Sequence, residues 1–211
     1  MKNAPGRFIT FEGIDGCGKT TQFRILGQWL RERGEGVTET VEPGGTPIGR
    51  QIRKLLLDPE SADMRPRTEL LLYFASRAQN IEQVIRPALD RGNIVLCDRF
   101  TDSTLVYQGW GRGLDLSIVR DLDRLACGGL APDLTLLIDI DLETSLQRAR
   151  RRNERLGPAE SRIDEEDVAF HERVRQGYLA LAEAEPARIV VIDGRAPIGE
   201  VALRIRTALG V

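Results

Sequence analysis

The segment Gly13–Thr20 carries the residue types that hold a phosphate chain. It reads Gly-Ile-Asp-Gly-Cys-Gly-Lys-Thr and fits the pattern GxxxxGK[ST]. Glycines let consecutive backbone N–H groups turn inward around an anion, and the start of a following helix adds partial positive charge. Lys19 would reach the β- and γ-phosphates, while the Thr20 hydroxyl would bind Mg²⁺. We therefore expect ATP or GTP to bind with Mg²⁺ at Gly13, Ile14, Asp15, Gly16, Cys17, Gly18, Lys19, Thr20 and Thr21.

Arginines supply a candidate for a second anion site. Arg99 follows Asp98 at the end of an apolar run, where it could grip an acceptor phosphate bidentately and Asp98 could serve the metal; a structural ion pair is the alternative. A further cluster could be a solvated helix face or a lid that closes over the transferring phosphoryl group. We favour a lid at about 148–163, with Arg150 and Arg152 as catalytic residues beside Lys19 and Arg99. The cluster comprises Arg148, Arg150, Arg151, Arg152, Arg155 and Arg162.

Regulatory GTPases, motor or transporter ATPases and small-molecule kinases all use such a phosphate-binding loop, and the sequence favours a small-molecule kinase. A regulatory GTPase needs NKxD and, downstream of the loop, DxxG; neither occurs here. The single histidine, His171, lies in a polar stretch and is expected at the surface. Transfer to a phosphate oxygen needs positioning and charge neutralisation rather than a base. A deoxynucleoside kinase stays open, because Glu12 or Asp98 could act as its base, and a nucleotide-dependent switch is the rival from another class.

An alternation of apolar strands and amphipathic helices must position these residues. Such alternation predicts an α/β fold with a five-stranded parallel sheet between two layers of helices, a P-loop NTPase fold in one domain of 211 residues. Ligands collect at the carboxyl ends of such strands. The expected strands are Arg7–Glu12, Val37–Glu42, Asn93–Asp98, Asp133–Asp139 and Arg188–Asp193. The expected helices are Thr20–Arg33, Pro47–Leu57, Thr68–Arg91, Ser117–Leu125, Leu142–Arg152, Glu165–Glu185 and Pro197–Leu209.

Composition and charge exclude several other classes. The formal charge of −2 gives no indication of binding to nucleic acid or a membrane surface. No segment approaches the roughly 20 apolar residues of a membrane span, and the start has no signal-peptide core, so we expect a cytoplasmic protein. The three cysteines have no zinc spacing and are expected to be reduced thiols.

Three motifs give the chain a resemblance to the thymidylate kinase (dTMP kinase) family. They are FEGIDGCGKTTQ at Phe11–Gln22, EPGGTPIG at Glu42–Gly49 and DRFTDSTLVYQGWGRG at Asp98–Gly113. The resemblance runs from about Phe8 to the final helix. It implies transfer of the γ-phosphate of ATP to dTMP with Mg²⁺, as a homodimer. A kinase for another nucleoside monophosphate is the alternative within the class.

The resemblance also implies roles for residues at the acceptor side. Tyr73 would stack on thymine and Arg77, four residues later on the same helix face, would bond its O4. Tyr107 would crowd a ribose 2′-OH, and Asp15 would approach the 3′-OH or the metal. The implied dTMP-binding residues are Asp15, Arg53, Tyr73, Arg77, Arg99, Ser103, Thr104, Tyr107 and Gln108, with Thr20 and Asp98 at the metal.

The family divides by the place of its catalytic charge. Some members carry an arginine in the phosphate-binding loop, whereas others carry glycine there and basic residues in the lid. Gly16 and the arginine cluster make this chain similar to the second, bacterial-type arrangement. Departures from the family pattern are Val41 in place of an arginine, Tyr73 in place of phenylalanine, and Ser161-Arg162-Ile163-Asp164 at the lid end.

Overall fold

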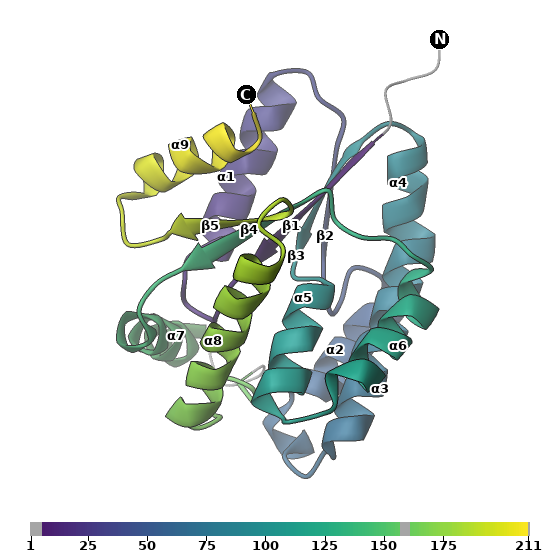
Figure 1. Ribbon diagram of the computed structural model, residues 1–211, viewed down its shortest axis with the longest axis vertical. Coiled ribbons are helices and arrows are strands. Elements are labelled where there is room, and N and C mark those ends of the chain that lie inside the picture. The colour runs from purple at the N-terminus through teal and green to yellow at the C-terminus, as the bar shows by residue number, and fades with distance from the viewer. Residues whose placement is uncertain (1–5, 157–160, 211) are drawn as a thin grey trace.

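A five-stranded parallel sheet forms the centre of the molecule (Figure 1). The computed structural model describes residues 6–156 and 161–210, without the side chains of 152–156. The strand order β2-β3-β1-β4-β5 places β1 in the middle, and each pair runs parallel. The predicted α/β fold is confirmed, and each predicted strand differs from the observed one by at most one residue at an end. The strands are β1 Arg7–Glu12, β2 Val37–Val41, β3 Ile94–Asp98, β4 Leu134–Asp139 and β5 Ile189–Asp193.

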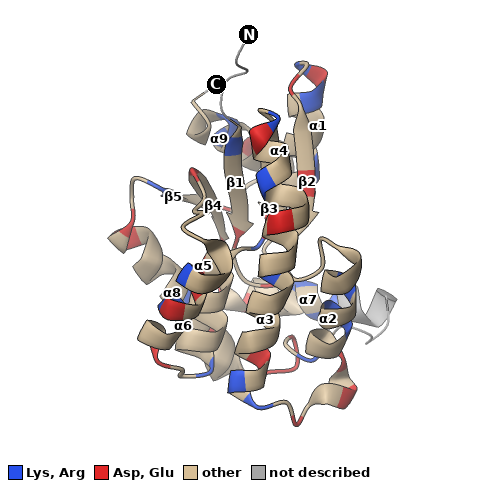
Figure 2. Ribbon diagram, turned by 90° about the vertical axis from the view of Figure 1, so that its right-hand side faces the viewer, with Lys and Arg blue, Asp and Glu red and all other residues tan. Residues whose placement is uncertain are grey.

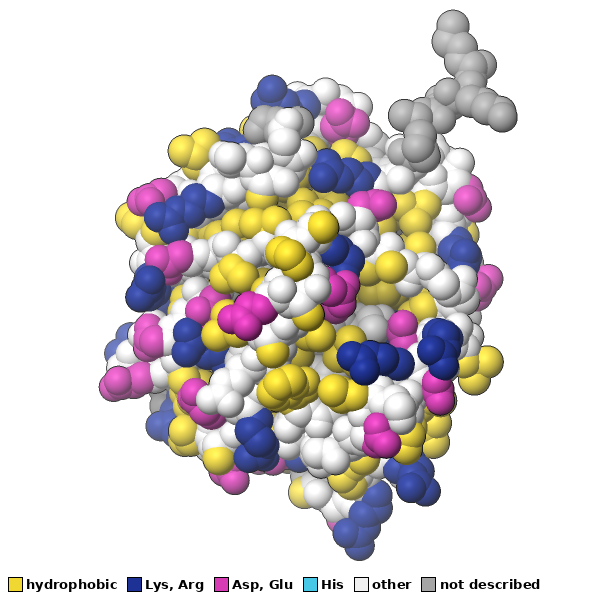
Figure 3. Space-filling view, viewed as in Figure 1, with side chains coloured by type: hydrophobic (Ala, Val, Ile, Leu, Met, Phe, Trp, Pro, Cys, Tyr) yellow, Lys and Arg dark blue, Asp and Glu magenta, His cyan; other side chains and the backbone are white. Residues whose placement is uncertain are grey.

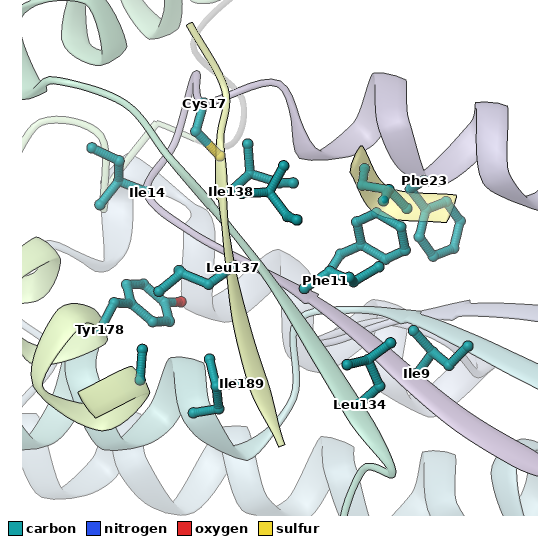
Figure 4. Packing of buried hydrophobic residues seen from close by; sticks show 14 of the residues in the cluster. Ile9, Phe11, Ile14, Cys17, Phe23, Leu134, Leu137, Ile138, Tyr178 and Ile189 are labelled. Carbon is teal, nitrogen blue, oxygen red and sulfur yellow. The ribbon is translucent and has the colours of Figure 1, made fainter. Parts of the chain in front are cut away.

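The pleat of the central strands divides the core into two layers. Phe8 of β1 packs in one cluster with η2 (Ile81–Ile85) and α4 (Arg86–Asp90), whereas Ile9 and Phe11 pack in the other with α1 (Lys19–Glu32). The Phe11 and Phe23 rings meet edge to face at 5.5 Å (Figure 4). Because side chains alternate along a strand, Thr10 and Glu12 share the face of Phe8. This alternation leaves a carboxylate buried beneath the carboxyl end of β1.

Helices cover both faces of the sheet. α1 and α9 pack together on one side, and α4 and α8 contact strands from the other (Figure 1). No helix in the described ranges is both long and apolar enough to cross a bilayer. The bounds are α1 Lys19–Glu32, α2 Pro47–Leu57, α3 Pro66–Asn80, α4 Arg86–Asp90, α5 Thr101–Thr104, α6 Leu116–Cys127, α7 Leu142–Leu156, α8 Val168–Ala184 and α9 Ile198–Ala208, with a short 3₁₀ turn η1 at Pro59–Ser61.

Two π-helical segments depart from the predicted helices. The predicted helix Thr68–Arg91 is interrupted by η2, Ile81–Ile85, just before Pro87, which has no N–H for the helical ladder. The second segment, η3 at Leu105–Gly111, continues α5 where no helix was predicted. Glycines and β-branched residues weaken the helical signal there, and burial of nearly every side chain stabilises the segment instead.

Charged residues of both signs alternate over the exposed helices. Figure 2 shows them interspersed along the ribbon, and Figure 3 shows acidic and basic side chains mixed across one face with small apolar areas between. The mixture agrees with the small formal charge of the sequence.

Candidate active site

The phosphate-binding loop lies between the end of β1 and the start of α1. Gly18 is the N-cap of α1 with a φ of 100°, and Gly16 has a φ of 83°. Both values fall in the left-handed region that glycine adopts without strain. Gly16 and Gly18 therefore let the chain turn from the strand directly into the helix, whose first N–H groups remain directed at the loop.

Lys19 lies over the loop, and Thr20 lies at its open side. The Lys19 side chain is 6% exposed, and its Nζ donates to the Ile14 carbonyl at 3.3 Å. The exposed Thr20 hydroxyl donates to Asp98 Oδ2 at 3.5 Å. The structure thus brings together a hydroxyl from the first turn of α1 and a carboxylate from the end of β3, which are oxygen donors of the kind that Mg²⁺ prefers.

A cleft of about 500 Å³ joins the two predicted anion sites. Asp15 through Thr21 line it on the loop side, and Arg53 and Arg99 line it on the other; Gly13 and Ile14 are not among the lining residues. Glu42, Asp98, Ile138, Arg148, Gly194, Ala196 and Ile198 complete most of its wall. The remaining predicted acceptor residues are not among the lining residues: Tyr73, Arg77, Ser103, Thr104, Tyr107 and Gln108.

Arg99 is the centre of a polar cluster at the acceptor end of the cleft. Its Nη2 donates to Asp15 Oδ1 at 2.9 Å and to the Tyr107 hydroxyl at 3.1 Å. Its Nη1 donates to Ser103 Oγ at 3.1 Å and to the Tyr178 hydroxyl at 3.2 Å. The Tyr107 hydroxyl also donates to Asp15 Oδ2 at 3.0 Å. Three other predicted site residues therefore meet at the Arg99 guanidinium, together with Tyr178, which the sequence did not indicate.

Glu12 lies fully buried beneath this cluster. Its carboxylate accepts from the Phe100 N–H at 2.7 Å, from Ser103 Oγ at 2.5 Å and from the Tyr178 hydroxyl at 2.8 Å. Burial, with Asp102 nearby, raises the pKa of Glu12 to about 7 against the opposing effect of Arg99. The Ser103 and Tyr178 hydroxyls also lie 2.8 Å apart, so these two oxygens and Glu12 Oε2 make three mutual contacts. The two hydroxyls supply only two protons, so all three contacts are hydrogen bonds only when Glu12 itself is protonated. These contacts, and its absence from the cleft lining, leave Glu12 unsuited as a base for a hydroxyl acceptor.

A second cluster holds Arg77 inside the protein. Its Nε donates to Glu42 Oε2 at 2.6 Å and its Nη2 to Thr104 Oγ1 at 2.9 Å, between the rings of Phe74 and Phe100. The side chain is 1% exposed, and Nη1 has no hydrogen-bond partner among the described residues. A buried guanidinium N–H without an acceptor is unfavourable, which makes this nitrogen a donor that still requires a partner.

Glu69, one turn before Tyr73 on α3, connects the remaining predicted residues. Its Oε1 accepts from Gln108 Nε2 at 2.9 Å, and its Oε2 accepts from Arg162 Nη2 at 2.6 Å. Burial and the Glu69 charge raise the pKa of Tyr73 to about 12, so its hydroxyl stays protonated at neutral pH. Arg162 also donates from Nε to the Leu56 carbonyl at 2.5 Å. Arg162, predicted as part of the lid cluster, is thus a buried anchor, because its partners lie on α2 and α3.

The base of α7 docks on the phosphate-binding loop. Ser145 Oγ donates to the Asp15 carbonyl, and a Cβ at Gly16 would lie 2.3 Å from the Ser145 carbonyl oxygen. Arg148, one turn further on, lines the cleft. Arg150 is exposed and is not among the lining residues, and the side chain of Arg152 lies outside the described part of the chain, as do residues 157–160 of the predicted lid.

Burial corrects one further expectation. His171, predicted at the surface, is 2% exposed and packs edge to face on Phe170, so that prediction is wrong. Its polar neighbours Glu172 and Arg173 are more exposed than His171. Tyr178 is a site residue that sequence reasoning missed, and Glu12 was considered there only as a base for a hydroxyl acceptor.

The fold and cleft define a P-loop phosphotransferase with a second, arginine-based anion site facing its loop. A family model described as thymidylate kinase matches residues 11–205. The chain belongs to the thymidylate kinase family. Both the resemblance drawn from the sequence and the enzyme class that it implied, an ATP-dependent nucleoside monophosphate kinase that phosphorylates dTMP, are confirmed.

Individual relatives support the family over nearly the whole chain. Thymidylate kinase of Geobacter sp. (strain M21) is 53% identical over 205 residues, covering 97% of this chain and 91% of the relative. That of Desulfosudis oleivorans is 54% identical over 204 residues, covering 96% and 95%. The crystal structure of thymidylate kinase from Ehrlichia chaffeensis matches with a TM-score of 0.79 at 35% identity, covering 99% of this chain and 100% of that one.

Proposed function

We propose that this enzyme places ATP and dTMP at opposite ends of one cleft and transfers the γ-phosphoryl group between them. The observation that carries the proposal is that Lys19 and Arg99 line the same cleft from its two sides. A donor phosphate on the loop and an acceptor phosphate on Arg99 would face each other without an intervening base. Positioning and charge neutralisation then supply the catalysis.

On the donor side, the loop from Gly13 to Thr21 cradles the ATP phosphates, with Lys19 as the point charge on the β- and γ-phosphates. Thr20 and Asp98 fit Mg²⁺, because the hydroxyl and carboxylate lie 3.5 Å apart at the mouth of the loop. The bound ion would neutralise charge on the phosphate oxygens. No group of three or more His, Cys, Asp or Glu side chains in the described ranges could hold a metal, which fits an ion held largely by phosphate and water.

On the acceptor side, Arg99 binds the dTMP phosphate while Asp15, Ser103 and Tyr107 surround it and the deoxyribose. Tyr73 stacks on thymine. Arg77 Nη1, buried without a partner in the described part of the chain, donates to O4 once the base is bound. Thr104 and Gln108 support this base site through Arg77 and Glu69, and Arg53 borders it, with Nη1 donating to the Pro43 carbonyl at 3.0 Å.

The single domain carries its lid on α7. We assign the lid to the arginines that follow Ser145: Arg148 lines the cleft, and Arg150 and Arg152 would join it on closure. The contacts of Arg162 with Leu56 and Glu69 support a lid that ends before Ser161. Closing arginines would stabilise the equatorial charge of the transferring group and exclude water.

Acceptor selectivity tests this assignment. With ATP and Mg²⁺, we expect turnover of dTMP to exceed that of dUMP, dCMP, AMP and GMP, and thymidine to give no product, because it brings no phosphate to Arg99. Product formation is measured by chromatographic separation of the nucleotides. Phosphorylation of thymidine at a rate comparable to dTMP would contradict the proposed role of Arg99.

We propose that the enzyme is a cytoplasmic homodimer that acts on dissolved small-molecule substrates. We further propose that α2, α3 and α6 form the interface between the two copies. α3 contacts both neighbouring helices, and Figure 2 shows α3 between them with little charge along the ribbon. Five large apolar side chains on these helices are at least 47% exposed, which is the kind of surface that a second copy would cover. They are Ile48, Leu55, Leu71, Ile118 and Leu125.

A charge at the centre of this surface should dissociate the dimer. We expect Leu71→Glu to shift the protein from dimer to monomer in size-exclusion chromatography with light scattering. Leu203→Glu on α9 is the matched control, because Leu203 is similarly exposed on the other side of the sheet. A wild-type protein that is already monomeric, or a Leu71→Glu variant that stays dimeric, would exclude this interface.

A further inference from the structure

The segment that carries Arg99 has a backbone that needs support. Arg99 has a φ of 69°, whereas the other residues with positive φ in the described part of the chain are glycines. For a residue other than glycine this backbone conformation is unfavourable, so surrounding contacts must hold it. Arg99 N–H donates to the Phe11 carbonyl at 3.0 Å, and the next N–H, that of Phe100, donates to Glu12 Oε1 at 2.7 Å.

The other oxygen of Glu12 extends this support to the side chain of Arg99. Glu12 Oε2 accepts from Ser103 and Tyr178, and those two hydroxyls accept from Arg99 Nη1 at 3.1 and 3.2 Å. Tyr178 is 3% exposed, and in Figure 4 its ring lies among the apolar side chains near Leu137 and Ile189, which fix its position. A buried carboxylate thus holds the backbone of the segment with one oxygen and one guanidinium edge with the other.

We propose that Glu12 and Tyr178 are positioning residues for Arg99, which they hold ready for the acceptor phosphate without touching substrate. The inference rests on the proposed function, in which Arg99 binds that phosphate. Tyr178 comes from α8, which follows the lid in the chain, so the acceptor site is assembled from three distant segments: the end of β1, the segment after β3 and α8.

Removal of the Tyr178 hydroxyl tests the inference most directly. Tyr178→Phe keeps the buried ring but removes the hydroxyl that accepts from the charged Arg99 guanidinium. Because this hydrogen bond lies on the acceptor side alone, KM for dTMP should rise about tenfold while KM for ATP changes less than about twofold. Steady-state kinetics with each substrate varied in turn gives both values. Equal changes in the two KM values, or no change in KM for dTMP, would overturn the inference.

A double-mutant cycle separates positioning from a general loss of packing. In an Arg99→Ala background, Tyr178→Phe should have no further effect on KM for dTMP, because the residue acts through Arg99. Full additivity would overturn the inference. If Arg99→Ala itself leaves the acceptor KM unchanged, the proposed function fails instead, so the two failures are distinguishable.

Two further variants guard against an effect of altered stability. Thr10→Val removes another buried hydroxyl on the same face of β1, where Thr10 Oγ1 and Thr135 Oγ1 lie 2.8 Å apart, and should lower Tm without changing KM for dTMP. Glu12→Gln retains an acceptor for the Phe100 N–H and should raise KM for dTMP less than Glu12→Ala does. A Thr10→Val variant that reproduces the Tyr178→Phe kinetics would contradict the assignment.

Discussion

Lys19→Ala should reduce kcat/KM by about 10³-fold or more, the order expected when a preorganised donor is lost from a developing anionic charge. Lys19 is held over the loop by its contact with Ile14 and is 6% exposed, so its charge acts in a site with little water. The sequence has two other lysines, Lys2 and Lys54, and neither lies in the loop. Transfer from ATP to dTMP, followed by a coupled assay for ADP, measures the loss.

The matched control for Lys19→Ala is Lys54→Ala. Lys54 is exposed on α2 and does not line the cleft, so its removal should leave kcat/KM within about twofold of the wild type. Thermal unfolding of both variants should show that neither loses its fold. A folded Lys19→Ala protein that keeps most of its activity would refute the assignment of the loop as the donor site.

Arg99→Ala should raise KM for dTMP by about 10²-fold, because a charge-assisted bidentate contact with a phosphate is lost. Binding of an ATP analogue, measured by calorimetry, should change by less than about twofold, since the loop and Lys19 remain intact. Arg99→Lys is the second variant, because it keeps a long, positively charged side chain on the left-handed backbone of this position. Lysine keeps the charge without the bidentate geometry and should give an intermediate KM.

The outcome for both substrates decides the role of Arg99. If the ATP analogue and dTMP weaken equally in Arg99→Ala, then Arg99 supports the whole cleft rather than the acceptor. If dTMP is unaffected while kcat falls, Arg99 acts on the transferring group and not on acceptor binding.

The place and backbone geometry of the phosphate-binding loop, the proposed donor site, could be predicted from the sequence because its parts are local. Gly16, Gly18, Lys19 and Thr20 are near neighbours, and the strand and helix that they join follow from the apolar pattern alone. The parallel sheet was equally accessible, since apolar runs such as β4 are buried on both faces. In both cases the physical determinant lies within one short stretch of chain.

The proposed acceptor site depends on contacts between distant residues, which no local pattern reveals. Glu12 meets Tyr178 across 166 positions of sequence, and Arg162 meets Glu69 across 93. Charged side chains are usually expected at the surface, but Glu12 and Arg162 are buried. His171 is likewise buried, although it lies in a polar stretch of sequence. The helix of α5 and η3 was missed because tertiary burial, rather than helical propensity, stabilises it.

The close approach of Gly16 to α7 has a consequence for how such enzymes can diverge. Any side chain at position 16 would start 2.3 Å from the backbone oxygen of Ser145, so an arginine there requires α7 to move away from the loop. Moving α7 would carry Arg148 with it. The two arrangements of catalytic charge described above therefore require different placements of α7 relative to the loop. In this chain, the close packing of α7 on the loop is the physical reason that position 16 is a glycine.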